Sequence, residues 1–211
     1  MKQVKIAPAD SFDLNGTRLS IPSLAPGAGQ LAAETLSSAR GATDRGVIDA
    51  ALTKSLGELG APSSLPSDFG STSFLAADAS GRAVSCAVTM NGPFGAGASS
   101  NGIIMAKNPA SVPEGYGNAF LDPMIASGAQ NHGLHMVASA AGGPSSLASV
   151  IEALAVSGAS PKRSARDVLS AVAQGGPAGN LYTCRANGDK ADCSAASDPT
   201  QAGLASVIVG R

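Results

Sequence analysis

The chain has 211 residues, a length that fits one compact domain with at most one appended segment and excludes a multidomain assembly. Fourteen basic and fifteen acidic residues leave a formal net charge of -1, so no long-range field exists to attract nucleic acid or an anionic membrane surface. The sequence holds 40 Ala, 28 Ser and 26 Gly but only 42 residues of Leu, Ile, Val and Phe together. We therefore expect a folded core of small residues with closely approaching backbones.

Targeting signals are not expected in the chain as given. No stretch reaches the roughly 18 uncharged apolar residues that cross a bilayer. Residues 1–10 contain no apolar segment of the kind found in an export signal.

Three cysteines are too few for a disulfide scaffold. Cys184 and Cys193 flank a hairpin-turn signal, and we expect them to lie close together. A turn at Gly188-Asp189 would place them directly opposite each other, whereas a turn at Asn187-Gly188 would not. The sequence does not decide between a disulfide that joins these two cysteines and two free thiols.

The first 70 residues indicate a strand, a glycine-rich elbow and helices. The strand is expected at Thr17–Ile21, the elbow at Pro22–Gly29 and a helix at Gln30–Ala39. Apolar residues at helical spacing predict a second, short helix around residues 47–56. Residues 60–70 are rich in Pro, Ser and Gly and are interpreted as an exposed linker.

A β pattern begins abruptly after Gly70. Residues 71–79 and 83–90, separated by a turn at residues 80–82, predict a buried hairpin. Further strand-like pieces are Gly102–Ala106, Pro123–Ala126, Leu134–Ala140, Leu181–Arg185, Lys190–Ser194 and Gly203–Val209.

Two more helices are expected between these strands. One begins after Gly142-Gly143-Pro144-Ser145-Ser146 and carries Leu147, Val150, Ile151 and Leu154 on one face. The other follows Ser160-Pro161 and ends at Gly175-Gly176. Strands and helices in alternating blocks indicate a layered α+β fold.

Common nucleotide-binding, serine-hydrolase and metalloprotease motifs are absent from the sequence. His132 and His135 form an HxxH pair, but Asn131-His132-Gly133 is typical of a turn and no acidic residue or cysteine stands close by. We therefore expect a turn and a strand edge there, with no metal and no cofactor.

The segment from Gly70 carries the most specific pattern. It begins Gly-Ser-Thr-Ser-Phe and continues with Asp78, Gly81, Ala83-Val84, Thr89-Met90-Asn91 and Phe94-Gly95. This pattern resembles the start of the small subunit of γ-glutamyltranspeptidases, which are N-terminal-nucleophile hydrolases. In that family a threonine opens the small subunit after autocatalytic cleavage, and a Thr-x-Asn supports catalysis and substrate binding.

Alignment on the shared Asp-x-x-Gly-x-Ala-Val stretch assigns roles to individual residues. Ser71 falls on the nucleophile, while Thr89 and Asn91 fall on the catalytic Thr and the substrate-binding Asn. Thr72 remains the alternative nucleophile, with the register shifted by one.

Other blocks follow in the same order along the chain. Ala141–Ser145 is similar to the family's glycine pair before a helix, and Ala196–Pro199 to its C-terminal Ala-Ser-Asp-Pro. The resemblance thus covers residues 71–211 as a small-subunit-like catalytic domain. Within residues 1–70, Arg18–Leu31 resembles the end of the large subunit, most of which is missing. The implied fold is a four-layer αββα sandwich or a fragment of it.

The resemblance also implies a mechanism. Cleavage between Gly70 and Ser71 would convert a zymogen into an enzyme whose Ser71 hydroxyl uses its own α-amine as base. Gly142 and Gly143 would direct backbone N–H groups at an oxyanion. The implied activity is hydrolysis or acyl transfer on a small γ-glutamyl or related amide, as in glutathione metabolism. A separate large-subunit chain, a homo-oligomer and a periplasmic or secreted location are further implications.

Two departures from the family bear on the substrate. Residues 106–112 lack the acidic group that meets the glutamyl ammonium, and residues 119–123 replace the family's Ser-Ser-Met-Ser-Pro. A pocket without those partners would bind a zwitterion weakly. A non-catalytic relic, or a subunit that requires a separate large chain, is therefore the alternative interpretation.

Overall fold

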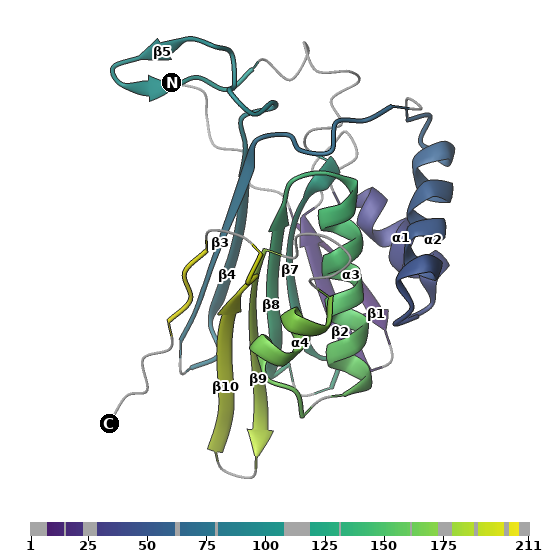
Figure 1. The fold of residues 1–211 in the computed structure, drawn as a ribbon. Helices are drawn as coiled ribbons and strands as arrows, with labels where there is room; N and C mark the ends of the chain where they lie inside the picture. Colours follow the sequence, from purple (N-terminus) through teal and green to yellow (C-terminus); the bar gives the residue numbers. More distant parts are fainter. Residues whose placement is uncertain are drawn as a thin grey trace.

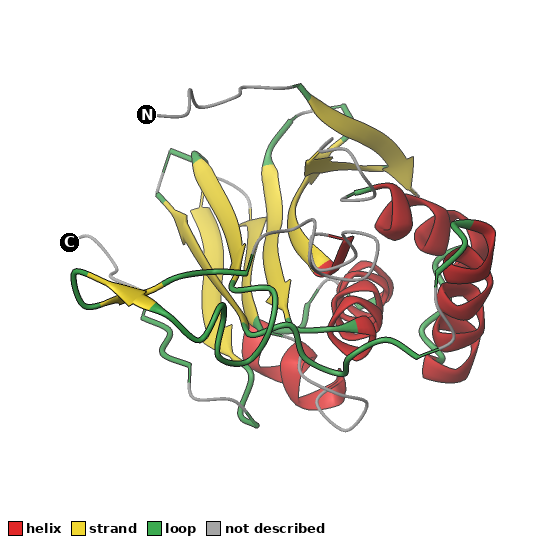
Figure 2. Cartoon of the chain, turned by 90° about the horizontal axis from the view of Figure 1, so that it is seen from above, coloured by secondary structure: helices red, strands yellow, loops and turns green. Residues whose placement is uncertain are grey.

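The computed structural model describes residues 8–14, 16–22, 29–61, 64–78, 80–107, 119–130, 132–160, 162–172, 179–187, 190–200 and 203–206. These residues form a mixed α+β fold, as the sequence predicts. Four helices cover one face of a large sheet, and a long hairpin packs on the other face (Figure 1). Seen from above, the helices gather on one side of the molecule and the strands on the other (Figure 2). None of the described helices is long and apolar enough to span a bilayer.

The large sheet has six strands, and every neighbouring pair is antiparallel. In spatial order they are β1 (Ala9–Leu14), β2 (Thr17–Pro22), β7 (Leu121–Gly128), β8 (Leu134–Ala141), β9 (Asn180–Asn187) and β10 (Lys190–Ser197). The ladder between β2 and β7 stops at Ser20 and Ile125. Two positions further in the same register Pro22 would face Pro123, and neither residue has an N–H to donate.

Strand β1 is absent from the sequence prediction. Its side chains are almost all exposed, so it lacks the alternation of apolar and polar residues that identifies a strand with one buried face. A signal was nevertheless present, because Leu14 pairs with Thr17 and the two residues between them are Asn15-Gly16. Asn-Gly between two short strands is the strongest local indication of a hairpin.

The helices are α1 (Gln30–Ala39), α2 (Arg45–Glu58), α3 (Pro144–Ala159) and α4 (Ala165–Val172). Helices α1 and α2 occur where the sequence predicts them. Helix α3 begins at Pro144, three residues before the predicted start at Leu147, because proline is favoured at the first position of a helix. Helix α4 begins at Ala165 rather than directly after Ser160-Pro161, because Ser164 and Asp167 cap it: the Ser164 hydroxyl accepts from Asp167 N at 3.2 Å and the Asp167 carboxylate accepts from Ser164 N at 3.3 Å. Its expected end at Gly175-Gly176 lies outside the described residues.

Most of the core lies between these helices and the sheet. Its largest fully buried aliphatic side chains include Ile21, Leu31, Ile48, Met124, Leu147, Ile151, Leu169 and Leu181. Alanines on both layers let the backbones approach closely, as the composition predicts.

The second sheet is a hairpin of β3 (Ser71–Ala77) and β4 (Ala83–Thr89), which packs on β7, β8 and β9. Serines hold it to the large sheet: Ser73 Oγ donates to the Ser139 carbonyl at 3.1 Å, and Ser85 Oγ to the Ala138 carbonyl at 2.7 Å. The expectation of a buried hairpin is wrong for one of its two faces. Its outer face is open, because Phe74 is 54% exposed and Val88 is 51% exposed.

Two further strand predictions hold only in part. Of Gly102–Ala106, only Ile103–Ile104 (β6) is a strand, and it pairs with Ser99–Ser100 (β5) in a small exposed hairpin. Of Gly203–Val209, residues 203–206 run alongside the protein without strand pairing, and residues 207–209 lie outside the described part. Ile103, Ile104 and Leu204 have exposed side chains, so burial in a core does not stabilise a longer strand at either place.

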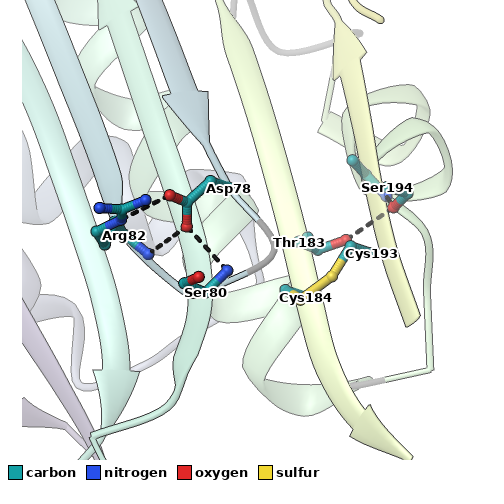
Figure 3. Close-up of a disulfide and its surroundings, with 8 residues drawn as sticks. Asp78, Ser80, Arg82, Thr183, Cys184, Cys193 and Ser194 are labelled. Atoms are coloured by element: carbon teal, nitrogen blue, oxygen red, sulfur yellow. Dashed lines mark hydrogen bonds and ion pairs between the residues drawn. A yellow bond between two sulfur atoms is a disulfide. The ribbon is translucent and has the colours of Figure 1, made fainter. Parts of the chain in front are cut away.

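A disulfide joins β9 and β10 (Figure 3). Cys184 and Cys193 are directly opposite in the register, with their Cα atoms 4.0 Å apart. The prediction that they lie close together is confirmed, and the register is the one that a turn at Gly188-Asp189 requires.

Figure 3 also shows the turn of the β3–β4 hairpin, where the Asp78 carboxylate accepts from Ser80 N and from Arg82. The hydrogen bonds from the Arg82 side chain and backbone lower the pKa of Asp78.

Candidate active site around Ser71

Ser71 is the first residue of β3 and lies opposite Thr89, the last residue of β4. Met90 N donates to the Gly70 carbonyl at 3.0 Å, so the neighbouring pair Gly70 and Met90 is hydrogen-bonded. Hydrogen-bonded and non-hydrogen-bonded pairs alternate in an antiparallel ladder, and side chains are closest in the second kind. Ser71 and Thr89 form such a close pair, and Ser71 Oγ donates to Thr89 Oγ1 at 3.0 Å.

The Thr89 hydroxyl uses all of its hydrogen-bonding capacity. It donates to the Phe69 carbonyl at 3.1 Å and accepts from Ser71 Oγ and, at 2.9 Å, from Asn91 N. A hydroxyl has one proton to donate and two lone pairs to accept with. Thr89 therefore holds the Ser71 hydroxyl in place and has no capacity left to act as its base.

Gly70, the residue before Ser71, has a backbone conformation and surroundings that require glycine. Its φ is +63°, in the left-handed region, and a Cβ there would collide with the backbone carbonyl of Gly92. Its N–H donates to the Asp68 carboxylate at 2.7 Å, and its carbonyl accepts from Met90. The Gly70–Ser71 peptide is thus held on both sides, with a backbone donor on the carbonyl oxygen that cleavage would attack.

Asn91 is 7% exposed and has a φ of +55°, which asparagine tolerates better than most residues. Its side-chain Nδ2 donates to the Lys107 carbonyl at 3.2 Å, and Lys107 N in turn donates to the Met90 carbonyl at 2.9 Å. Asn91 therefore ties residue 107 to the end of β4. Its predicted role in substrate binding stays a prediction.

Gly142 and Gly143 lie at the start of α3 and are both buried. The Gly142 carbonyl accepts from Phe69 N at 3.2 Å, two residues before Ser71. A Cβ on Gly143 would collide with the backbone carbonyl of Ser67. The fold thus brings the predicted glycine pair against the segment that leads into Ser71.

The backbone of Gly143 is extended. Its φ is -143°, a value open to other residues. Close packing against Ser67, rather than backbone strain, is what requires glycine at this position. The role of Gly142 and Gly143 as oxyanion donors stays a prediction.

Phe69 is the element of the site that the sequence interpretation missed. Residues 60–70 were expected to form an exposed linker. Phe69 is instead 1% exposed, and its ring stacks on the ring of Phe120 with centroids 5.5 Å apart. Its backbone serves the site as well, because its carbonyl accepts from Thr89 Oγ1 and from Gly92 N. A single large aromatic residue in a run of Pro, Ser and Gly was the available signal.

A cavity of about 450 Å³ opens beside Ser71. It is lined by residues 71–75 of β3, residues 179–181, residues 195–196 of β10 and residues 203–206. None of these described lining residues carries a charged side chain. The cavity therefore suits a neutral group better than an ion.

Asp122, on β7, was not singled out in the sequence. It is fully buried, and its two carboxylate oxygens have no hydrogen-bond partner among the described residues. Burial raises the pKa of this carboxyl well above its usual value. It lies on the helix-facing side of the sheet, as do Met124 and Ala126 in the alternating burial pattern of β7.

The HxxH pair occupies a turn and a strand edge, as predicted. His132 has a φ of +55°, and His135 is the extra residue of a β-bulge, where the register passes from Ala126 and Met136 to Ser127 and Leu134. Within the described part of the chain, no group of three or more His, Cys, Asp and Glu side chains is placed to hold a metal ion.

Comparisons of the chain with protein-family models, with curated protein sequences and with solved structures found no match.

Proposed function

We propose that this chain is a divergent amide hydrolase or acyltransferase of the N-terminal-nucleophile type, similar to γ-glutamyltranspeptidases. In this proposal it cuts its own Gly70–Ser71 bond and then works through an ester on Ser71. The observation that supports it best is the contact of Ser71 Oγ with Thr89 Oγ1 at 3.0 Å, directly after a glycine held at a φ of +63°.

The cleavage step follows from that arrangement. Ser71 Oγ attacks the Gly70 carbonyl carbon, and the carbon–nitrogen bond breaks as the ester forms, with the hydroxyl proton ending on the released amine. Water then hydrolyses the ester, which leaves a carboxylate on Gly70 and a free α-amine on Ser71. Met90 N–H, already 3.0 Å from the Gly70 oxygen, would stabilise negative charge on that oxygen during the attack.

The same hydroxyl would act on an added substrate. The freed α-amine takes the proton from Ser71 Oγ as the oxygen attacks the substrate amide. In this scheme Gly142 and Gly143 donate backbone N–H groups to the oxyanion, and Asn91 contacts the substrate. The leaving amine departs with a proton, and water or a second amine releases the acyl group from Ser71. The scheme requires no metal or cofactor.

Self-cleavage can be tested directly on the full chain. A denaturing gel of freshly purified protein should show fragments of 70 and 141 residues, and mass spectrometry should place the new N-terminus at Ser71. Ser71→Ala should leave one intact band, because the attacking oxygen is gone. Thr72→Ala is the matched control and should still be cut, since Thr72 is exposed on the outer face of β3.

Two outcomes would contradict this scheme. If Thr72→Ala blocks cleavage and Ser71→Ala does not, the nucleophile is Thr72. If the wild-type chain stays intact, the self-processing proposal fails.

A non-catalytic relic or partner-dependent subunit is the second candidate. The observation that favours it is the open outer face of the β3–β4 hairpin, where Phe74, Val84 and Val88 are each more than half exposed. An αββα sandwich would cover that face with a second helical layer, and none of the described helices lies there. An intact band from the wild-type chain is the result expected for this candidate.

A further inference from the structure

The cavity beside Ser71 runs along the free edge of β3. Five consecutive residues of this strand, 71–75, line it. Side chains alternate between the two faces of a strand, so a cavity that touches five in a row follows the edge, where the backbone N–H and C=O groups are. Among the described strands, β4 is the only partner of β3, and it occupies the opposite edge.

The register shows which backbone groups face the cavity. Because Gly70 and Met90 are a hydrogen-bonded pair, the backbone groups of Ser71, Ser73 and Leu75 point away from β4. One of these groups is already used in this direction: the Ser73 carbonyl accepts from the Asn180 side-chain Nδ2 at 2.9 Å. This donor comes from β9 of the large sheet, and the carbonyl oxygen keeps a second lone pair that an added strand could use.

We propose that this edge binds an extended, uncharged peptide of about four residues, as an added strand whose acyl carbon lies at Ser71. Main-chain hydrogen bonds to Ser71 and Leu75 would supply the affinity, as in other proteins that add a strand at a sheet edge. Residues 71–75 span about 14 Å in extended conformation, the length of four peptide units. This inference rests on the proposed function, because it names the substrate class of the same site.

The lining explains why the peptide is uncharged. The described side chains that line the cavity are hydroxyl, amide, aliphatic and aromatic groups, with no opposite charge to pair with an ion. An ionised side chain that leaves water without a partner loses binding free energy. Leu204, at the rim, is 93% exposed and would be covered by the bound peptide.

Binding can be measured without catalysis by using the full chain with Ser71→Ala, which keeps the backbone of β3. In isothermal titration calorimetry, N-acetyl-tetra-alanine amide should bind at least about tenfold more tightly than the same peptide N-methylated on its backbone amides, because methylation removes the donated N–H groups. N-acetyl-tetraglutamate amide and N-acetyl-tetralysine amide should also bind at least about tenfold more weakly than the alanine peptide. Equal affinity for the methylated peptide, tighter binding of a charged peptide, or no binding of the alanine peptide would each overturn the inference.

A second pair of variants locates the site. Leu204→Asp should weaken binding of the alanine peptide by about tenfold, since it replaces an apolar rim contact with a charge. Phe94→Asp is the control, because Phe94 is 82% exposed and lies outside the cavity lining, and it should leave the affinity unchanged. Equal effects of the two variants would contradict a site at this edge. Peptide binding by a chain that never cleaves itself would refute the proposed function and leave only the peptide-binding edge of β3 standing.

Discussion

The ring of Phe69 stacks on the ring of Phe120, with centroids 5.5 Å apart and planes inclined by 20°. Both side chains are buried, at 1% and 0% exposure. This contact fixes the segment before Ser71 to the start of β7. The Phe69 carbonyl is thereby positioned to accept from Thr89 Oγ1, so the packing of one aromatic pair supports the geometry of the proposed nucleophile.

Phe69→Ala should lower the free energy of unfolding by about 3–5 kcal/mol, because it removes a fully buried aromatic side chain and leaves a cavity against Phe120. Urea unfolding followed by circular dichroism measures the change. Phe94→Ala makes the same chemical change at an exposed position and should stay within about 0.5 kcal/mol of wild type. Similar losses for both variants would show that Phe69 is not a core residue.

Thr89→Val keeps the shape of the side chain and removes the hydroxyl that receives Ser71 Oγ. Self-cleavage should slow by about 100-fold, since a misplaced nucleophile loses the benefit of orientation. Thr89→Ser restores the hydroxyl and should restore most of the rate, as followed by fragment formation on denaturing gels. Unchanged cleavage in Thr89→Val would remove Thr89 from the site.

Gly143→Ala should destabilise the fold by about 1–3 kcal/mol, because its Cβ would lie 2.8 Å from the Ser67 carbonyl carbon and closer still to its oxygen. Gly158→Ala in the same helix is the matched control: a Cβ there meets nothing within 4 Å. The control should be neutral or stabilising by up to about 1 kcal/mol. Thermal unfolding of both variants decides the matter, and equal stability would contradict the tight approach at Gly143.

Gly143→Pro would change the backbone conformation as well as remove the proposed oxyanion donor. Proline requires a φ near -65°, whereas Gly143 has a φ of -143°, and the added ring would meet the Ser67 backbone. A loss of activity in that variant would follow from the backbone change alone.

Asp122 should make the protein less stable as pH rises. Burial raises the pKa of its carboxyl in the folded state, so the folded protein binds a proton more tightly than the unfolded chain does. Its contribution is complete below the unfolded value, near 3.8, and is lost as pH rises through the higher folded value. Within that window the free energy of unfolding falls by up to about 1.4 kcal/mol per pH unit.

Asp122→Asn removes this titration and should be more stable than wild type at neutral pH but not at acidic pH. Denaturant unfolding across the pH range gives both curves. Asp10→Asn is the control at an exposed position of β1 and should leave the wild-type curve unchanged. Parallel wild-type and Asp122→Asn curves would show that this carboxyl does not titrate on folding.

Much of the architecture was predictable because its signals are local. Apolar spacing located α1, α2 and most of α3. Strand-like runs bounded by turn residues located β3, β4 and every strand of the large sheet except β1. The start of α4 was misplaced because Ser164 and Asp167 cap the helix four residues beyond the proline signal. Strand β1 was missed because an exposed strand leaves no hydrophobic pattern, although its Asn-Gly turn was visible.

The sequence by itself determined the order of most elements and the candidate residues Ser71, Thr89 and Asn91. It also determined that Cys184 and Cys193 lie opposite each other if the turn is at Gly188-Asp189. These follow from local preferences and from short-range pairing in hairpins. Only the tertiary structure decided that Phe69 is buried against Phe120, and that Gly143 packs on Ser67. It also decided that one edge of β3 opens onto an uncharged cavity. Such contacts join residues far apart along the chain, and their choice depends on how whole layers pack, which no local pattern encodes.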